Sequence, residues 1–137
     1  MYDDQYANKI DDIVFWKEII SKYPKQEKRI LEIGAGTGRI AKEIINESIY
    51  YTGIDKSNNY SAVGNKKIEN LHNRGKILNF DMASFNLNTT FDIIFIPFNT
   101  LLHLTTEKDI NRCFSCVRMH MKKEALFYID VFVPNPL

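Results

Sequence analysis

Hydrophobic residues recur along this chain in two alternating patterns. In four segments the apolar positions repeat at helical spacing, which places them on one helix face. These predicted helices are residues 4–23, 39–47, 58–73 and 107–120. Between them lie short apolar runs rich in β-branched and aromatic residues, which are typical of strands. These predicted strands are residues 29–33, 50–55, 76–80, 91–96 and 125–133.

Alternating strands and helices predict an α/β fold with a parallel sheet and helices on both of its faces. Apart from Asp92 and Asp130, the runs 91–96 and 125–133 are apolar on both faces, as expected for strands covered on both sides. No repeat or linker interrupts the 137 residues, so we expect residues 1–137 to form a single domain. In such sheets ligands bind beyond the carboxyl ends of the strands, where the strand order reverses.

A glycine-rich loop, Gly34-Ala35-Gly36-Thr37-Gly38, follows the first predicted strand. Glycine lets the backbone turn sharply and approach a ligand closely, although a tight turn without any ligand would show the same pattern. Three acids favour a ligand: Glu32 just before the loop, Asp55 at the end of the second strand, and Asp81 after the third. A carboxylate at Asp55 can accept both hydroxyls of a ribose, and one at Asp81 can accept an adenine amino hydrogen. The set predicts a nucleoside pocket.

The spacing of the glycines indicates which kind of nucleoside ligand the loop fits. A dinucleotide loop has the pattern G-x-G-x-x-G, but Arg39 stands where its third glycine would be, which disfavours a nucleotide-dependent oxidoreductase. The pattern E-x-G-x-G-x-G from Glu32 to Gly38 resembles motif I of the class I S-adenosylmethionine-dependent methyltransferases. Further stretches resemble later motifs of that family, the last of them in its bacterial small-molecule subgroup. These are residues 51–57, 80–82, 91–104 and 129–136.

The resemblance implies a Rossmann-like methyltransferase core with strand order 3-2-1-4-5 and S-adenosylmethionine as cofactor. It assigns the methionine part of the cofactor to the glycine loop and to the acid that precedes it. These residues are Glu32, Gly34, Ala35, Gly36 and Gly38. It assigns the adenosine part to Asp55, Lys56, Asp81 and Met82. The backbone of Pro97, Phe98 and Asn99 would lie near the reacting methyl group.

Methyl transfer from a sulfonium asks little of the protein beyond placing the acceptor in line and excluding water. A hydroxyl acceptor also needs a base, and His103 is the candidate because it follows the fourth predicted strand. A capping or packing role for His103 is the alternative. The resemblance implies a small-molecule acceptor.

A C-x-x-C-x-x-x-H pattern places Cys113, Cys116 and His120 on one face of the helix predicted over residues 107–120. Such a face could hold zinc or a redox pair. The same face carries the apolar stripe that the helix needs to cover the sheet, and no fourth ligand is evident. We therefore predict reduced, buried thiols and no metal.

The charge and composition of the chain argue against nucleic acid and membranes as binding partners. A net charge of +1 argues against a broad grip on nucleic acid or on an anionic membrane. No apolar run approaches the ~18 residues of a membrane span, and the acidic N-terminus does not resemble a signal peptide. Two cysteines cannot form a disulfide scaffold, so we expect a cytoplasmic protein.

Length is where the chain departs from the family, whose members usually continue with a substrate-covering insertion, another helix and a final strand pair. Here the sequence ends at Leu137, so we expect the final strand pair to be absent and the fifth strand to lie at the sheet edge. Unpaired edges recruit other chains, which predicts a homo-oligomer or a partner subunit over this strand. We also expect methyl transfer to require such a partner or the missing C-terminal region. The alternative to an enzyme is a non-catalytic S-adenosylmethionine-binding subunit that completes or regulates a partner methyltransferase.

Overall fold

The structure, a computed structural model, describes the backbone of residues 2–97 and 100–131 and the side chains from residue 12 onward within these ranges. Its strands form one five-stranded parallel sheet in the order β3-β2-β1-β4-β5, as predicted. They are β1 (Lys28–Ile33), β2 (Ile49–Asp55), β3 (Gly75–Asn79), β4 (Phe91–Ile96) and β5 (Met121–Ile129). The helices are α1 (Tyr2–Lys22), α2 (Ala41–Ile44), α3 (Asn58–Ile68) and α4 (Glu107–Met119), with a 3₁₀ turn η1 (Thr100–His103).

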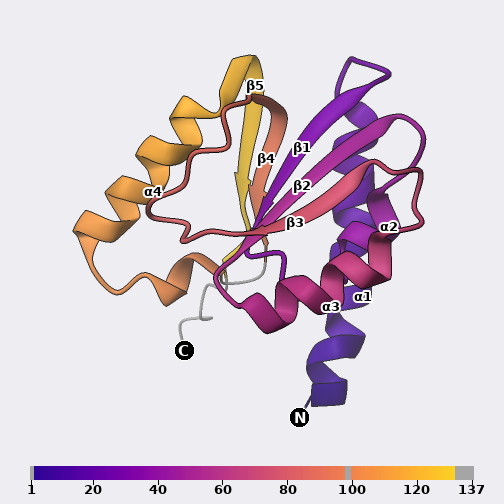
Figure 1. The fold of residues 1–137 in the computed structure, drawn as a ribbon, viewed down its shortest axis with the longest axis horizontal. Coiled ribbons are helices and arrows are strands. Elements are labelled where there is room, and N and C mark those ends of the chain that lie inside the picture. Colours follow the sequence, from indigo (N-terminus) through magenta and orange to yellow (C-terminus); the bar gives the residue numbers. More distant parts are fainter. Residues whose placement is uncertain (1, 98–99, 132–137) are drawn as a thin grey trace, which may run out of the picture.

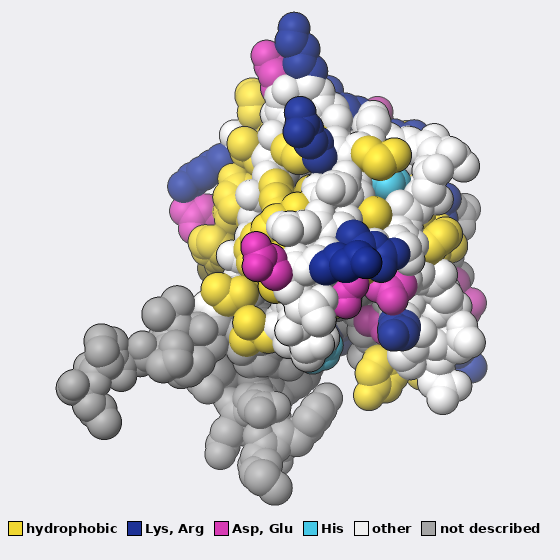
Figure 2. Space-filling model, turned by 90° about the vertical axis from the view of Figure 1, so that its left-hand side faces the viewer, with side chains coloured by type: hydrophobic (Ala, Val, Ile, Leu, Met, Phe, Trp, Pro, Cys, Tyr) yellow, Lys and Arg dark blue, Asp and Glu magenta, His cyan; other side chains and the backbone are white. Residues whose placement is uncertain are grey.

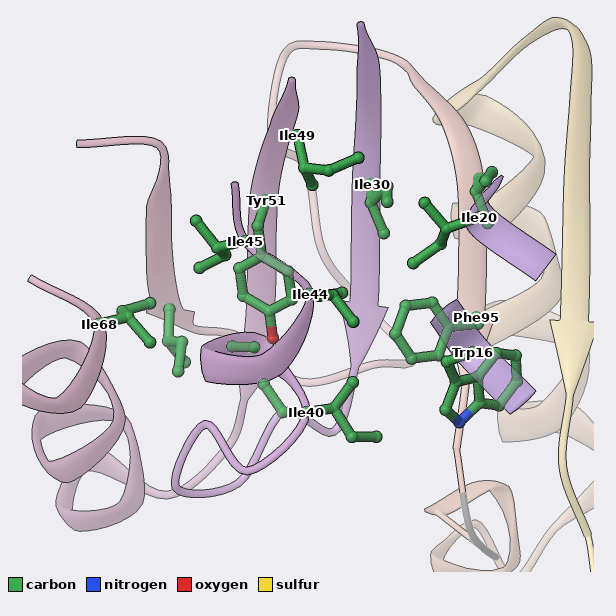
Figure 3. Packing of buried hydrophobic residues seen from close by; sticks show 14 of the residues in the cluster. Trp16, Ile20, Ile30, Ile40, Ile44, Ile45, Ile49, Tyr51, Ile68 and Phe95 are labelled. Carbon is green, nitrogen blue, oxygen red and sulfur yellow. The ribbon is translucent and has the colours of Figure 1, made fainter. Parts of the chain in front are cut away.

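The sheet is the middle of three layers, with α1, α2 and α3 on one face and α4 on the other (Figure 1). Successive residues of β1 and β4 point to opposite faces, so each central strand contributes to two cores. Figure 3 shows the first core, in which Trp16 and Ile20 of α1 pack near Ile30 and Phe95. The second core contains Ile94 and, from α4, Cys113 and Val117. This arrangement explains why β4 is buried along its whole length.

Two helices are shorter than the hydrophobic pattern predicts. The helix predicted over residues 39–47 is reduced to one turn, because the Asn46 side chain accepts the Ser48 N–H (2.8 Å) and so competes with helical pairing. The helix predicted over residues 58–73 ends at Ile68, and His72 and Asn73 then adopt left-handed backbone angles of 58° and 53°. None of the helices in the described ranges is long and apolar enough to span a membrane.

The fifth strand begins four residues before its predicted start at residue 125. His120 ends α4 by donating its N–H to Val117, and the chain enters β5 at once at Met121. The charged residues that follow belong to β5, but they fall where its register with β4 shifts, between the pairs Phe91–Met121 and Ile93–Leu126. The Lys122 ammonium group lies 3.3 Å from the carboxylate of Asp92. None of the residues of β5 is fully buried, although Tyr128 packs against the first core and Phe127 against the second. Residues 132 and 133 of the predicted strand lie outside the described residues.

Polar side chains secure the sheet at three places. Asp92, which is buried at the start of β4, accepts hydrogen bonds from the Arg29 N–H (2.8 Å) and from Lys25 (3.0 Å). On the outer side of β3, Asn65 of α3 donates to the Ile77 carbonyl (2.8 Å) and accepts from the Ile77 N–H (2.7 Å). The third place is His120, whose Nε2 atom accepts the N–H of Leu87 in the loop before β4 (2.9 Å).

Candidate functional site

A cavity of about 700 Å³ opens beyond the carboxyl ends of β1, β2 and β3. Its position matches the switch point of the sheet, where β1 has β2 on one side and β4 on the other. The walls come from the segments that follow β1, β2, β3 and β4 and from the start of α4. The lining residues used below are Gly34, Gly36, Asp55, Lys56, Tyr60, Asp81, Met82, Thr100, His103, Asp109 and Arg112.

The glycine loop turns at three left-handed residues, Gly34, Gly36 and Gly38, with φ of 81°, 58° and 80°. A side chain at any of these positions would strain the backbone. A Cβ atom built on Gly36 meets no atom within 4 Å, so this glycine faces open space. The loop therefore presents bare backbone to the cavity, as a ligand-binding loop requires.

Close packing against α3 supports the same loop. Gly38 approaches Gly64 so closely that a Cβ atom on Gly38 would lie 3.3 Å from the Gly64 Cα atom. A Cβ atom on Gly64 would in turn lie 3.1 Å from the Thr37 carbonyl carbon. Glycine is a weak helix former, but the small size of Gly64 lets α3 pack on the loop.

Asp55 ties the glycine loop to the start of α3. One carboxylate oxygen accepts the Gly36 N–H at 2.8 Å, and the other accepts the Ser57 N–H at 2.9 Å. A carboxylate has about four acceptor positions, so both oxygens keep capacity for further donors such as ribose hydroxyls. The structure thus places Asp55 in the cavity wall as predicted.

The far wall of the cavity carries the residues predicted for the adenine. Asp81 is anchored by accepting the Ala83 N–H at 2.8 Å, and the Lys56 ammonium lies 3.9 Å from its other oxygen. Met82 lies beside it and is half-buried. Tyr60 of α3 also lines this wall, where its 56% exposed side chain offers a ring face. Sequence reasoning did not assign Tyr60 to the site.

A smaller cavity of about 320 Å³ adjoins the first and shares Gly34, Gly36, Tyr60 and Thr100 with it. Glu32 lines this cavity but is only 2% exposed, and its carboxyl group accepts the Tyr51 hydroxyl at 2.5 Å. Burial raises the pKa of Glu32 to about 8, although the Tyr51 hydrogen bond and the charge of Arg39 oppose this rise. Glu32 therefore holds a proton at neutral pH.

The N-terminal helix contributes an ion pair to this smaller cavity. Arg39, part of its lining, donates to Asp12 of α1 at 2.7 Å. The other Asp12 oxygen and the indole nitrogen of Trp16 are both buried and have no hydrogen-bond partner in the described part of the chain. In Figure 3 this nitrogen points away from the ring of Phe95, on the side where β1 ends. Sequence reasoning used Arg39 only to exclude a dinucleotide and missed its place in the wall.

The loop after β4 closes the site from the side opposite α3. Pro97 lines the smaller cavity, whereas Phe98 and Asn99, which were also predicted for the site, lie outside the described residues. Thr100 packs so closely on Gly34 that a Cβ atom there would lie 2.8 Å from the Thr100 hydroxyl. His103 is exposed in the wall of the larger cavity.

The cysteine and histidine motif at the end of α4 lines neither of these two cavities. Cys113 is buried, which raises its pKa to about 12, and Cys116 is half-buried; both are free thiols. His120 uses both ring nitrogens, donating from Nδ1 to the Cys116 carbonyl (2.6 Å) and accepting the Leu87 N–H at Nε2 (2.9 Å). Within the described ranges no three acidic, cysteine or histidine side chains could hold a metal ion together. His120 thus fastens the loop before β4 to α4.

Known proteins resemble the chain in sequence and in fold. Residues 30–124 match a family described as "Methyltransferase domain". A putative methyltransferase of Geobacillus sp. (strain WCH70) is 29% identical over 121 residues, which are 85% of this chain and 49% of the relative. The putative methyltransferase YqeM of Bacillus subtilis (strain 168) is 26% identical over 117 residues, covering 85% and 47%. The chain thus spans about half the length of these curated relatives.

Solved structures share the fold at low sequence identity. CalS10, an amino pentose methyltransferase from Micromonospora echinaspora solved with bound S-adenosylmethionine, superposes with a TM-score of 0.82 at 17% identity, covering 96% of this chain and 56% of CalS10. The glycopeptide N-methyltransferase MtfA gives a TM-score of 0.74 at 21% identity, covering 85% and 52%. The family match covers more than half of the chain and confirms the resemblance of its motifs, so the chain belongs to the class I methyltransferase domain family.

Proposed function

We propose that this chain binds S-adenosylmethionine across the two adjoining cavities and forms the cofactor-binding part of a methyltransferase that acts on a small molecule. The observation that carries the proposal is the left-handed glycine loop held by Asp55. It combines bare backbone, free carboxylate acceptors and open space beside Gly36 at the switch point of the sheet. These are the features that a nucleoside with a charged amino-acid tail needs.

The two cavities divide the cofactor between them. The larger one would take the adenosine part, with Asp55 accepting the ribose hydroxyls and Asp81, Met82 and Lys56 at the adenine. The smaller one would take the methionine part, with its amino group near Glu32. Binding an ammonium group there favours the ionised form of Glu32, so the carboxyl group would release its proton when the ligand binds.

When bound, S-adenosylmethionine supplies an activated methyl group. The residues of this chain then have to orient the cofactor, hold the acceptor in line and keep water out. His103, exposed in the cavity wall, would take the proton of a hydroxyl acceptor. An unprotonated amine would not need this base, so the effect of replacing His103 distinguishes the two kinds of acceptor.

The class of acceptor is proposed from the relatives. CalS10 is an amino pentose methyltransferase and MtfA methylates a glycopeptide, and both share the fold of this chain. Their names support a small-molecule acceptor for this chain.

The cellular location is proposed from the cysteines. The free thiols of Cys113 and Cys116 suit a reducing compartment, which supports a cytoplasmic location.

Isothermal titration calorimetry with S-adenosylmethionine, S-adenosylhomocysteine and NAD tests the cofactor. We expect the first two to bind and NAD not to bind. Asp55→Asn should weaken binding by about 30-fold or more, because it removes charge-assisted hydrogen bonds worth roughly 2 kcal/mol or more. Glu69→Gln, an exposed position at the end of α3, is the matched control and should bind normally. Binding of NAD alone, or equal affinities in all variants, would contradict the proposal.

We also propose that a second polypeptide covers the outer side of β5, and that a second copy of this chain is its first candidate. In the described sheet β5 pairs only with β4, and large apolar side chains near this edge are exposed. They are Phe114, Met119, Leu126, Ile129 and Val131. Figure 2, which faces the side of the molecule that carries α4, shows hydrophobic side chains gathered along one margin of this face. Exposed apolar edges of this kind favour association.

Light scattering over a range of concentrations tests this second proposal. We expect a dimer that Ile129→Lys weakens, whereas Val63→Lys, at an exposed position of α3, leaves it intact. A chain that stays monomeric and methylates an acceptor unaided would contradict the need for a second polypeptide. A monomer that binds cofactor without transferring methyl groups would favour the non-catalytic subunit as its function.

A further inference from the structure

A third cavity lies at the amino ends of the strands, at the opposite end of the sheet from the proposed cofactor site. It has a volume of about 230 Å³ and is formed where β2 and β3 begin. Its walls also include the loop that precedes β4. The lining residues used below are Arg29, Tyr50, Thr52, Arg74, Lys76 and Thr89. None of these residues belongs to the two cavities described above.

The charge of this cavity is of one sign. Arg29, Arg74 and Lys76 bring three cationic side chains to the lining, and no acidic residue is among the residues that form it. The carboxylate of Asp92 accepts the backbone N–H of Arg29, but it is occupied by the ammonium groups of Lys25 and Lys122 at 3.0 and 3.3 Å. The field in the cavity therefore favours an anion.

The two guanidinium groups are held in place by one aromatic ring. The guanidinium carbon of Arg74 lies 4.2 Å from the centre of the Tyr50 ring, and that of Arg29 lies 5.3 Å from the same point. Such cation–π contacts orient the planar groups before any ligand arrives. The Tyr50 ring thus restrains both guanidinium groups, although Arg29 is exposed and Arg74 is only half-buried.

One of these guanidinium groups has an unmet hydrogen-bonding need. The Nη1 atom of Arg74 is buried and has no acceptor within the described part of the chain. A buried charged donor without a hydrogen-bond acceptor is costly, because it has lost water and the contact with the Tyr50 ring does not replace the lost hydrogen bond. An oxyanion in the cavity would supply the missing acceptor, and the hydroxyls of Thr52 and Thr89 would add donors for it.

We propose that this cavity binds a small phosphorylated ligand, whose phosphate oxygens accept hydrogen bonds from Arg74 and are neutralised by Arg29 and Lys76. The fork of a guanidinium group matches two phosphate oxygens, which an isolated ammonium group cannot do. The site is separate from the glycine loop, so it is open while the cofactor is bound. It does not depend on the proposed methyl transfer.

Titration of the ¹⁵N-labelled chain with pyrophosphate, followed by NMR, tests the proposal. We expect saturable shifts at the amides of Tyr50, Thr52 and Lys76, and none at the glycine loop. Inorganic phosphate and a phosphate monoester are the next titrants, and they show whether a free or an esterified phosphate is preferred. Shifts confined to Gly34 and Gly36, or shifts that simply follow ionic strength, would overturn the proposal.

Two variants and a control assign the site. Arg74→Gln should weaken pyrophosphate binding by about tenfold or more, as expected for a charge-assisted pair. Lys76→Gln, at an exposed position where folding is not at risk, should weaken it by about threefold. Arg118→Gln removes the same charge from the exposed face of α4 and should change nothing. Unchanged affinity in both site variants, or binding of a single-stranded oligonucleotide without any response to pyrophosphate, would refute a small-ligand site.

Discussion

Replacing Glu32 by glutamine should change how the stability of the chain depends on pH. In the folded protein burial raises the pKa of Glu32 to about 8, compared with 4.5 for an unperturbed carboxyl group. Below pH 4.5 the folded and unfolded chains both carry the proton, and the burial costs little. As the pH rises towards 8, the unfolded chain releases the proton and the folded chain keeps it. The free energy of unfolding therefore falls over this interval.

The size of this effect follows from the gap between the two pKa values. At about 1.4 kcal/mol for each pH unit, the interval from 4.5 to about 8 corresponds to a loss of about 5 kcal/mol. Glutamine keeps an oxygen that can accept the Tyr51 hydroxyl but carries no charge at any pH. Glu32→Gln should therefore be stabilised relative to the wild type by about 3 to 5 kcal/mol at pH 9, and hardly at all at pH 5.

Urea denaturation of both proteins at intervals from pH 5 to pH 9 measures this difference. The Tyr51 pKa is raised well above 10 by burial and by Glu32, so the tyrosine does not titrate in this range. Glu43→Gln, an exposed carboxyl on α2 that lies 4.0 Å from Lys17, is the control and should run parallel to the wild type. If the Glu32→Gln curve also runs parallel from pH 5 to pH 9, Glu32 is ionised in the folded chain and the reasoning fails.

Three further predictions concern residues that stabilise the fold. Gly34→Ala should destabilise the fold by about 2 kcal/mol or more, because its backbone is left-handed and the new methyl group would meet Thr100; thermal unfolding measures the loss. Burial alone would raise the pKa of Asp92, but its hydrogen bonds lower it overall, so Asp92→Ala should cost about 2 kcal/mol at pH 7 in urea denaturation. That cost should shrink as the pH falls below 3.8, where the wild-type carboxylate also loses its charge. His120→Ala should speed hydrogen exchange at the Leu87 amide by about tenfold or more, since the acceptor of its hydrogen bond is gone. Equal exchange rates would show that the loop is held by other contacts.

The site residues that could be predicted from sequence are those whose place follows from the strand that they end. Gly34, Gly36 and Asp55 fall at strand ends, and strand ends in a parallel sheet meet at one edge. Arg39 and Asp12 could not be paired in this way, because their contact depends on how α1 lies across the sheet. The same limit applies to Tyr60 and Thr100, which reach the cavity only through tertiary packing.

The start of β5 was predicted four residues too late, at residue 125 instead of Met121. The residues from Lys122 to Glu124 look like a surface turn in the sequence, yet they belong to β5. Lys122 is tolerated there because Asp92 of the neighbouring strand accepts its charge. A one-dimensional pattern cannot show a partner that lies 30 residues away along the chain.

The two hydrogen bonds between Asn65 and Ile77 determine which edge of the sheet can pair with another strand. An amide side chain that both donates to and accepts from one backbone residue imitates a neighbouring strand, so it blocks that position on the rim of β3. A chain added to this sheet would thus dock beside β5. If two copies met there about a two-fold axis, the combined sheet would end in two blocked rims, and assembly through this edge would stop at a pair instead of extending into a fibre.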